Sequence, residues 1–120
     1  MQSSTNINHN YLIAIDGSEA SHIAYEVVTT SLMSTSGRQD FLTLGHVFSR
    51  AKSYLPFNMQ PDSIRMTYES LIAGYGSHAY FMWEELNPKF TTKEHVIDMA
   101  KRSNSDIIVV GMHGRKGPKA

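Results

Sequence analysis

Short, unbroken apolar runs recur along this chain. The run Tyr11–Ile15 ends at the turn residues Asp16 and Gly17, a pattern typical of a strand that is buried on both faces. Three further runs predict strands in the same way: Phe41–Phe48, Tyr80–Trp83 and Ile107–Val110. For the run Tyr80–Trp83, a helix that continues through it is the alternative.

Between the runs, apolar residues recur with the 3.6-residue period of a helix. After the first run, Ser18 is a candidate N-cap and the helix is expected to end by Gly37. Its apolar stripe is Ala20, Ile23, Ala24, Val27 and Val28. Residues 49–61 predict a loop, after which Asp62 is the candidate N-cap of a second helix. The stripe of that helix is Ile64, Tyr68, Leu71, Ile72 and Tyr75.

A third helix is predicted before the last apolar run. Asn87 and Pro88 mark a turn, and Thr91 and Glu94 have the spacing of a capping box, in which each side chain reaches the other residue's backbone N–H. The buried face of this helix is expected to comprise Val96, Met99 and Ala100.

Strands and helices therefore alternate through the chain. This order favours an α/β fold with an open, mostly parallel sheet, right-handed crossovers and helices on both faces. We assign residues 11–120 to one domain of this kind and residues 1–10, which are polar, to a disordered or extended N-terminal tail.

Composition narrows the classes of function. The 120 residues carry 11 basic and 11 acidic side chains, and a net charge of zero argues against nucleic acid or an anionic membrane as the main partner. There is no cysteine, so disulfides and thiolate chemistry are excluded. No apolar run approaches the roughly 20 residues that span a bilayer, and the polar N-terminus has no secretory signal pattern. We therefore expect a soluble protein of the cytoplasm.

Two loops are candidates for binding chemistry, because ligands of open α/β sheets bind beyond the carboxyl ends of the strands. In the loop Gly111–Gly117, three glycines let backbone N–H groups approach an anion, and Arg115 and Lys116 add positive charge. In the loop after the first run, Asp16 can accept hydrogen bonds from a ribose hydroxyl or an adenine amino group. A plain turn and an N-cap are the alternatives for these loops, and the common dinucleotide and P-loop fingerprints are missing.

Catalytic and metal-binding patterns are scarce. The six histidines are scattered with no pair at helical ligand spacing, so we predict no metal site in this chain. We interpret Glu84, Glu85 and Asp98 as solvated surface charges.

Three segments resemble one known family. YLIAIDGSEASHIAYEVV resembles the opening of universal stress protein domains, and LTLGHV resembles their second strand. SDIIVVGMHGRKG resembles their fourth strand and the glycine-rich loop that follows it. The three segments occur in the order and spacing of the family, whereas residues 49–90 match only in the order of their elements.

The resemblance implies a strand order of 3-2-1-4 and an adenine nucleotide, ATP or a related one, as ligand. In ATP-binding members, the positions matching Ala14, Ile15 and Asp16 flank the adenine and the ribose, and the position matching Val47 contacts the base. The start of the phosphate loop matches Val110, Gly111, His113 and Gly114. The implied role is regulatory, in a stress response, with at most weak ATP hydrolysis.

The chain departs from the family pattern near its end. The family loop continues to a further Gly-Ser/Thr, a fourth helix and a fifth strand, whereas this sequence ends at Ala120. We therefore expect a domain shortened on its C-terminal side, with the fifth strand missing and an exposed apolar edge at the fourth strand. The alternative function is a structural or interaction module with a vestigial nucleotide site, packed in a homodimer or a larger assembly.

Overall fold

The computed structural model describes residues 8–33, 40–49 and 56–111 of the chain. The predicted site residues His113 and Gly114 lie outside these ranges, as does the predicted helix end at Gly37. Within the described ranges, no helix is both long and apolar enough to cross a membrane.

Four strands form one parallel sheet in the order β3-β2-β1-β4. They are β1 (Asn10–Ala14), β2 (Phe41–Phe48), β3 (Ala79–Glu85) and β4 (Ile107–Val109). This arrangement confirms the predicted α/β sheet and the strand order 3-2-1-4. The helical alternative for Tyr80–Trp83 is wrong, because these residues pair with β2 along the whole of β3. Since β2 and β4 flank β1, the winding direction of the sheet reverses beside β1.

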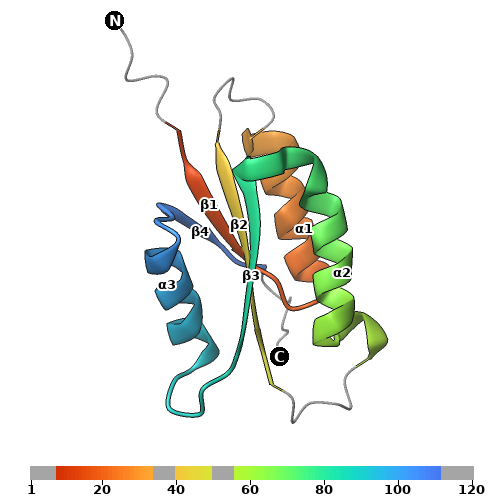
Figure 1. The fold of residues 1–120 in the computed structure, drawn as a ribbon, viewed down its shortest axis with the longest axis vertical. Coiled ribbons are helices and arrows are strands. Elements are labelled where there is room, and N and C mark those ends of the chain that lie inside the picture. The colour runs from red at the N-terminus through yellow and green to blue at the C-terminus, as the bar shows by residue number, and fades with distance from the viewer. Residues whose placement is uncertain (1–7, 34–39, 50–55, 112–120) are drawn as a thin grey trace, which may run out of the picture.

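Helices cover both faces of this sheet (Figure 1). On one face lie α1 (Glu19–Val27), which continues as a π-helical segment over Val28–Met33, and α2 (Pro61–Ile72). On the other face lies α3 (Thr92–Arg102). Short 3-10 helices precede and follow α2, at Phe57–Met59 and Ala73–His78.

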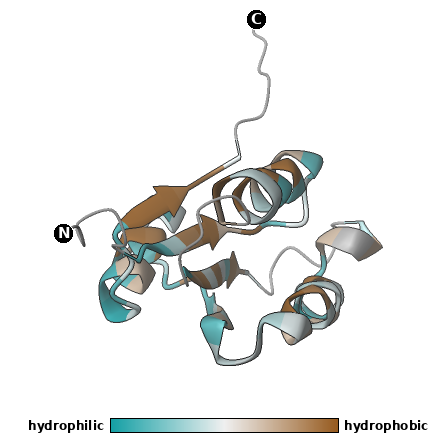
Figure 2. Cartoon of the chain, turned by 90° about the horizontal axis from the view of Figure 1, so that it is seen from above, coloured by the Kyte–Doolittle hydropathy of each residue, from teal (hydrophilic) through white to brown (hydrophobic). Residues whose placement is uncertain are grey.

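Strands and helices both contribute to the apolar core, and hydrophobic stretches of the strands are brown in Figure 2. Side chains alternate across a strand, so neighbouring residues of β1 enter different clusters. Tyr11 and Ile13 belong to the large cluster beneath α1 and α2, whereas Leu12 packs with α3 in a smaller one. The buried α3 members of that smaller cluster are Val96, Met99 and Ala100, which confirms the predicted face of the third helix.

The stripe predicted for the first helix is confirmed at Ala24 and Val28, which are buried, and wrong at Ile23 and Val27. Ile23 and Val27 are 51% and 47% exposed. Tyr25 turns inward instead, because its ring packs edge-on against Tyr68 of α2 at 5.5 Å between centroids. Ser21 is also buried, and its hydroxyl donates to the Ser18 carbonyl at 3.1 Å, which offsets the cost of burying it. The buried residues of this segment are Ser21, Ala24, Tyr25 and Val28.

The second helix begins slightly earlier than predicted. Its N-cap is Gln60 and not Asp62, because Pro61 occupies the first helical position, where a fixed φ and a missing N–H cost nothing. Of its predicted stripe, Leu71 is exposed, and the buried members are Ile64, Tyr68 and Ile72. Gly76 adopts a positive φ of 60°, which breaks the helical path before β3.

Candidate functional site

A cavity of about 580 Å³ lies at the carboxyl ends of β1, β2 and β4, beside the N-terminus of α3. Open α/β sheets bind ligands at this position. The connections to β2 and to β4 run to opposite sides of β1, and a crevice opens between them. The volume falls in the range of sites for small molecules. The lining residues are Ala14, Ile15, Asp16, Ser21, Gly45, Val47, Thr92, Lys93, Val96, Ile97, Ile108, Val110 and Gly111.

Most of the residues predicted from the sequence meet at this cavity. Those that line it are Ala14, Ile15, Asp16, Val47, Val110 and Gly111. They come from three separate segments of the chain, and the parallel pairing of β1 with β2 and β4 brings the segments together. His113 and Gly114 lie outside the described residues, and nucleotide binding by the whole set stays a prediction.

The turn after β1 presents Asp16 at the cavity rim. The carboxylate Oδ1 of Asp16 accepts the Ser18 N–H at 2.9 Å, and Gly17 takes a positive φ of 84° that suits glycine. The N-cap of α1 is Ser18, whose Oγ accepts the Ser21 N–H at 3.2 Å, as predicted. Asp16 is therefore not the N-cap, and its carboxylate is exposed next to the cavity.

Gly111 closes the cavity where β4 ends. A Cβ atom at this position would lie 2.4 Å from the backbone carbonyl carbon and oxygen of Ala20 and 2.6 Å from the Ser21 nitrogen. No residue with a side chain fits there without moving the backbone. The glycine thus lets the chain just after β4 lie directly against the first turn of α1.

The N-terminus of α3 supplies cavity residues that sequence reasoning did not select. The predicted capping box is present: Thr91 Oγ1 accepts the Glu94 N–H at 3.1 Å, and Glu94 Oε1 accepts the Thr91 N–H at 2.8 Å. It fixes the start of α3, so Thr92 and Lys93 line the cavity. The capping box predicts from the sequence where α3 begins. Only the tertiary structure shows that this helix start lies at the carboxyl ends of the strands, beside the cavity. Lys93 brings a positive charge to this rim.

His46 lies beneath the site, on the strand face opposite to Gly45 and Val47. It is 4% exposed, and its Nδ1 lies 2.7 Å from the carbonyl oxygen of Ile15. Burial lowers the pKa of His46, although the hydrogen bond to Ile15 and the charge of Asp16 oppose the shift. The ring is therefore neutral near pH 7.

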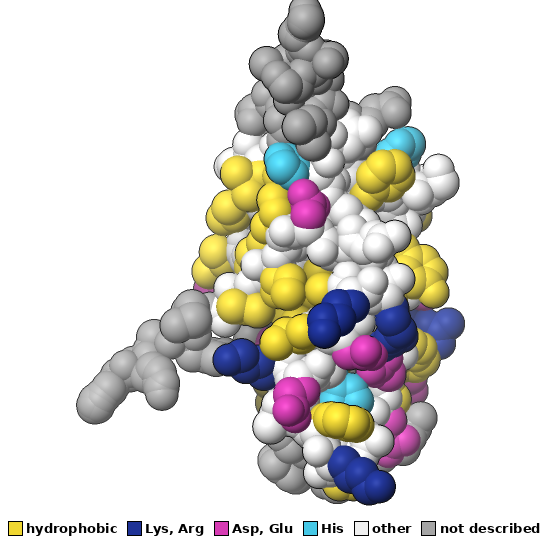
Figure 3. All heavy atoms as spheres, turned by 90° about the vertical axis from the view of Figure 1, so that its left-hand side faces the viewer, with side chains coloured by type: hydrophobic (Ala, Val, Ile, Leu, Met, Phe, Trp, Pro, Cys, Tyr) yellow, Lys and Arg dark blue, Asp and Glu magenta, His cyan; other side chains and the backbone are white. Residues whose placement is uncertain are grey.

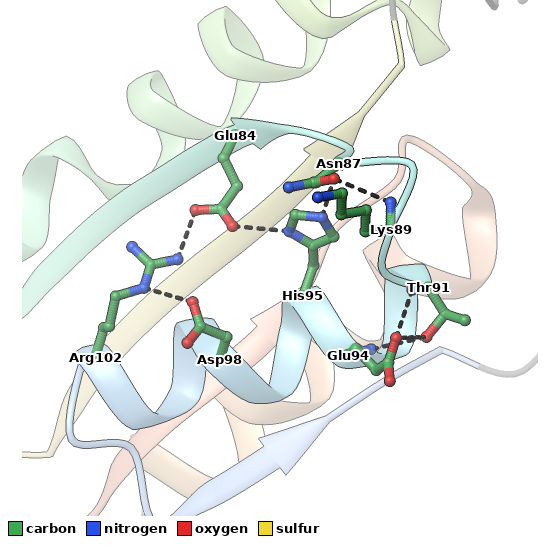
Figure 4. Close-up of polar contacts among 8 residues, drawn as sticks. All are labelled: Glu84, Asn87, Lys89, Thr91, Glu94, His95, Asp98 and Arg102. Atoms are coloured by element: carbon green, nitrogen blue, oxygen red, sulfur yellow. Dashed lines mark hydrogen bonds and ion pairs between the residues drawn. The ribbon is translucent and has the colours of Figure 1, made fainter.

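A second polar cluster joins β3 to α3 (Figure 4). Glu84 accepts from His95 Nδ1 at 2.9 Å and from Arg102 Nη2 at 2.5 Å, and Arg102 Nε also donates to Asp98 at 2.8 Å. Burial alone raises the pKa of Glu84, but the hydrogen bonds from His95 and Arg102 outweigh it and lower the pKa. The interpretation of Glu84 as a solvated charge is wrong, because its position on β3 faces α3.

The hydrogen bonds of this cluster attach α3 to β3. The Nε2 atom of His95 accepts the Asn87 N–H at 2.9 Å, so both ring nitrogens of His95 are engaged. No lone pair of this histidine is left for a metal or a proton transfer. Among the residues that the structure describes, no three histidine or acidic side chains are grouped to hold a metal ion.

The parallel order β3-β2-β1-β4, with helices on both faces and a cavity beside β1, is the universal stress protein fold. Two solved structures share it, each with a TM-score of 0.60, 15% sequence identity and 93% of this chain covered. One is protein Rv1636 from Mycobacterium tuberculosis H37Rv, of which 77% is covered. The other is a protein from the universal stress protein family from Burkholderia pseudomallei, of which 86% is covered.

The sequence comparisons add no closer relative. No protein-family model matches the chain, and no curated protein matches its sequence. At 15% identity, the two structural matches show the fold, and they confirm what the three resembling segments implied about it.

Proposed function

We propose that this domain binds an adenine nucleotide, ATP or a related one, in the cavity beside β1, and that it acts as a regulatory binding module. The observation that carries the proposal is the meeting of Asp16, Val47 and Gly111 around one cavity at the winding reversal of the sheet. The three residues come from segments that lie far apart in the sequence.

The residues present fit the parts of such a ligand. The cavity walls are mainly apolar and include Val47 of β2 and Ile108 of β4, so they suit a flat purine ring. The exposed carboxylate of Asp16 suits ribose hydroxyls as hydrogen-bond donors. Lys93, at the N-terminus of α3, supplies positive charge for a phosphate.

Isothermal titration calorimetry of the protein with ATP tests this proposal. We expect saturable binding of ATP at millimolar concentrations or below, weaker binding of GTP, and still weaker binding of tripolyphosphate, which has no base for the apolar walls. Absence of ATP binding at millimolar concentrations would refute the proposal. Equal affinity for ATP and tripolyphosphate would place recognition on the phosphates and not on the apolar walls of the cavity.

Matched variants locate the site. Val47→Phe fills the cavity and is expected to abolish ATP binding, whereas Val27→Phe makes the same change on the exposed side of α1 and serves as its control. Asp16→Asn is expected to weaken ATP binding about 10-fold, which corresponds to about 1.5 kcal/mol, the lower end of the range for a hydrogen bond to a charged group. Asp62→Asn, in the first turn of α2, is its control.

A second function, assembly with another copy of this chain, is favoured by the surface beside β4. Among the described strands, β4 pairs only with β1, so its outer edge offers unpaired backbone groups. Ile108 and Val110 of this strand region are 43% and 52% exposed, and Ile97 of α3 lies beside them. Figure 3 shows hydrophobic side chains forming a band on this side of the molecule, next to the charged side chains.

Sedimentation equilibrium tests the assembly. If β4 edges pair between copies, the protein is dimeric at micromolar concentrations and Ile108→Lys makes it monomeric. Met66→Lys, at a 73% exposed position on α2, is the matched control and leaves the dimer intact. A monomer at all concentrations would rule out this second function.

A further inference from the structure

His46 makes a contact that packing alone does not account for. The register of β1 with β2 ends at the pair Ala14 and Gly45, and the Ile15 N–H donates to the Gly45 carbonyl at 2.8 Å. The carbonyl of Ile15 then accepts from the side chain of His46 at 2.7 Å. The imidazole thus continues the attachment of β1 to β2 beyond the last paired residue.

Among the residues that the structure describes, the other ring nitrogen of His46 has no hydrogen-bond partner. A carbonyl oxygen only accepts, so Nδ1 carries the proton and Nε2 is left as an acceptor. This Nε2 atom is buried and makes no hydrogen bond. An apolar side chain of similar size would fill the space without an orphaned acceptor, so burial by itself does not favour histidine here. The compensating interaction is the bond to Ile15.

We infer that His46 is a positioning residue for the candidate site: it fixes the Ile15 carbonyl and so sets the direction in which the chain leaves β1 toward Asp16. The backbone N–H of Asp16 lies 3.4 Å from Ser21 Oγ, and Gly111 lies against the backbone of Ser21. The Asp16 turn is therefore held by Ser21 of α1, against which Gly111 lies, and by the bond of His46 to Ile15. The expected effect of His46 on ligand affinity rests on the proposed function, whereas its effect on the backbone does not.

Two variants separate positioning from stability. His46→Asn keeps a side-chain N–H donor close to the place of Nδ1, whereas His46→Leu removes the donor and fills the space with apolar atoms. We expect His46→Asn to unfold at a lower urea concentration than His46→Leu, because it buries a smaller and more polar side chain. We nevertheless expect His46→Asn to bind ATP nearly as the native protein does, and His46→Leu to bind it about 3- to 10-fold more weakly.

Nuclear magnetic resonance of the ligand-free protein gives an independent readout. We expect nitrogen shifts of the His46 ring that report a proton on Nδ1. The carbonyl carbon shift of Ile15 and the amide shifts of Asp16 and Gly17 are expected to change in His46→Leu and to return toward native values in His46→Asn. A proton on Nε2, or signals of Ile15 and Asp16 that do not respond to His46→Leu, would overturn the inference.

The two proposals fail in different ways. If the native protein does not bind ATP, the proposed function fails, and the ring and carbonyl shifts alone decide the role of His46. If the native protein binds ATP but the affinity of the variants follows their stability, with His46→Asn the weaker binder, His46 is a packing residue and the inference is wrong.

Discussion

The contact between Gly111 and α1 yields a quantitative prediction. A Cβ atom at position 111 would lie 2.4 Å from backbone atoms of Ala20, about 1.1–1.6 Å less than the ordinary contact distance between carbon atoms. Backbone cannot rotate away as a side chain can, so the end of β4 or the first turn of α1 must shift. We expect Gly111→Ala to lower the free energy of unfolding by about 1–3 kcal/mol, the usual cost of overpacking a close contact.

Two other glycines serve as matched controls for this substitution. At Gly45 an added Cβ meets the Met99 sulfur at 2.9 Å, and a flexible thioether can move, so we expect a loss of about 1 kcal/mol or less. At Gly74 an added Cβ meets nothing within 4 Å. Gly74→Ala is expected to raise the free energy of unfolding by roughly 0.4–1 kcal/mol, because alanine restricts the unfolded chain.

Urea unfolding followed by circular dichroism measures all three variants on the same scale. The predicted order of stability is Gly74→Ala above the native protein, then Gly45→Ala, then Gly111→Ala. A Gly111→Ala variant as stable as Gly74→Ala would refute the reasoning, since it would mean that β4 and α1 do not approach each other so closely.

Three further predictions concern the cap, the core and the buried histidine. Thr91→Ala removes the hydroxyl that accepts the Glu94 N–H and should lower the free energy of unfolding by about 1 kcal/mol, with Thr92→Ala, at the first helical position, as the control in urea unfolding. Leu12→Ala empties a fully buried position beside Met99 and should cost about 2–5 kcal/mol; a loss below about 1 kcal/mol would contradict the packing. The pKa of His46 in the folded protein lies below its usual value of 6.5. Below about pH 6.5, the unfolded chain therefore binds a proton at His46 that the folded chain does not. The free energy of unfolding consequently falls as the pH falls. Urea unfolding between pH 7 and pH 5 should show a smaller fall in His46→Leu than in the native protein, and equal slopes would contradict the assignment.

Parts of the candidate site could be predicted from local sequence, and parts could not. Asp16 and Gly111 each follow an apolar run directly, so their places at strand ends were visible without a fold. The capping box was the local signal for Lys93, and Gly45 had none, but the approach of both to the cavity depends on which strand α3 covers. His46 was visible only as part of a resembling segment, and its bond to Ile15 joins residues 31 positions apart.

The sequence by itself determined the order and the type of the main elements, because apolar runs, Ser18 and the capping box at Thr91 act over a few residues. The sequence predicted both ends of β2 correctly, and it predicted the buried residues Val96, Met99 and Ala100 of α3. Only the tertiary structure decided which face of α1 is buried, where Tyr25 packs inward and Ile23 stays exposed. It also decided that the loops after β1 and β4 share one cavity, because contacts between distant segments depend on strand pairing, and pairing is a property of the whole sheet.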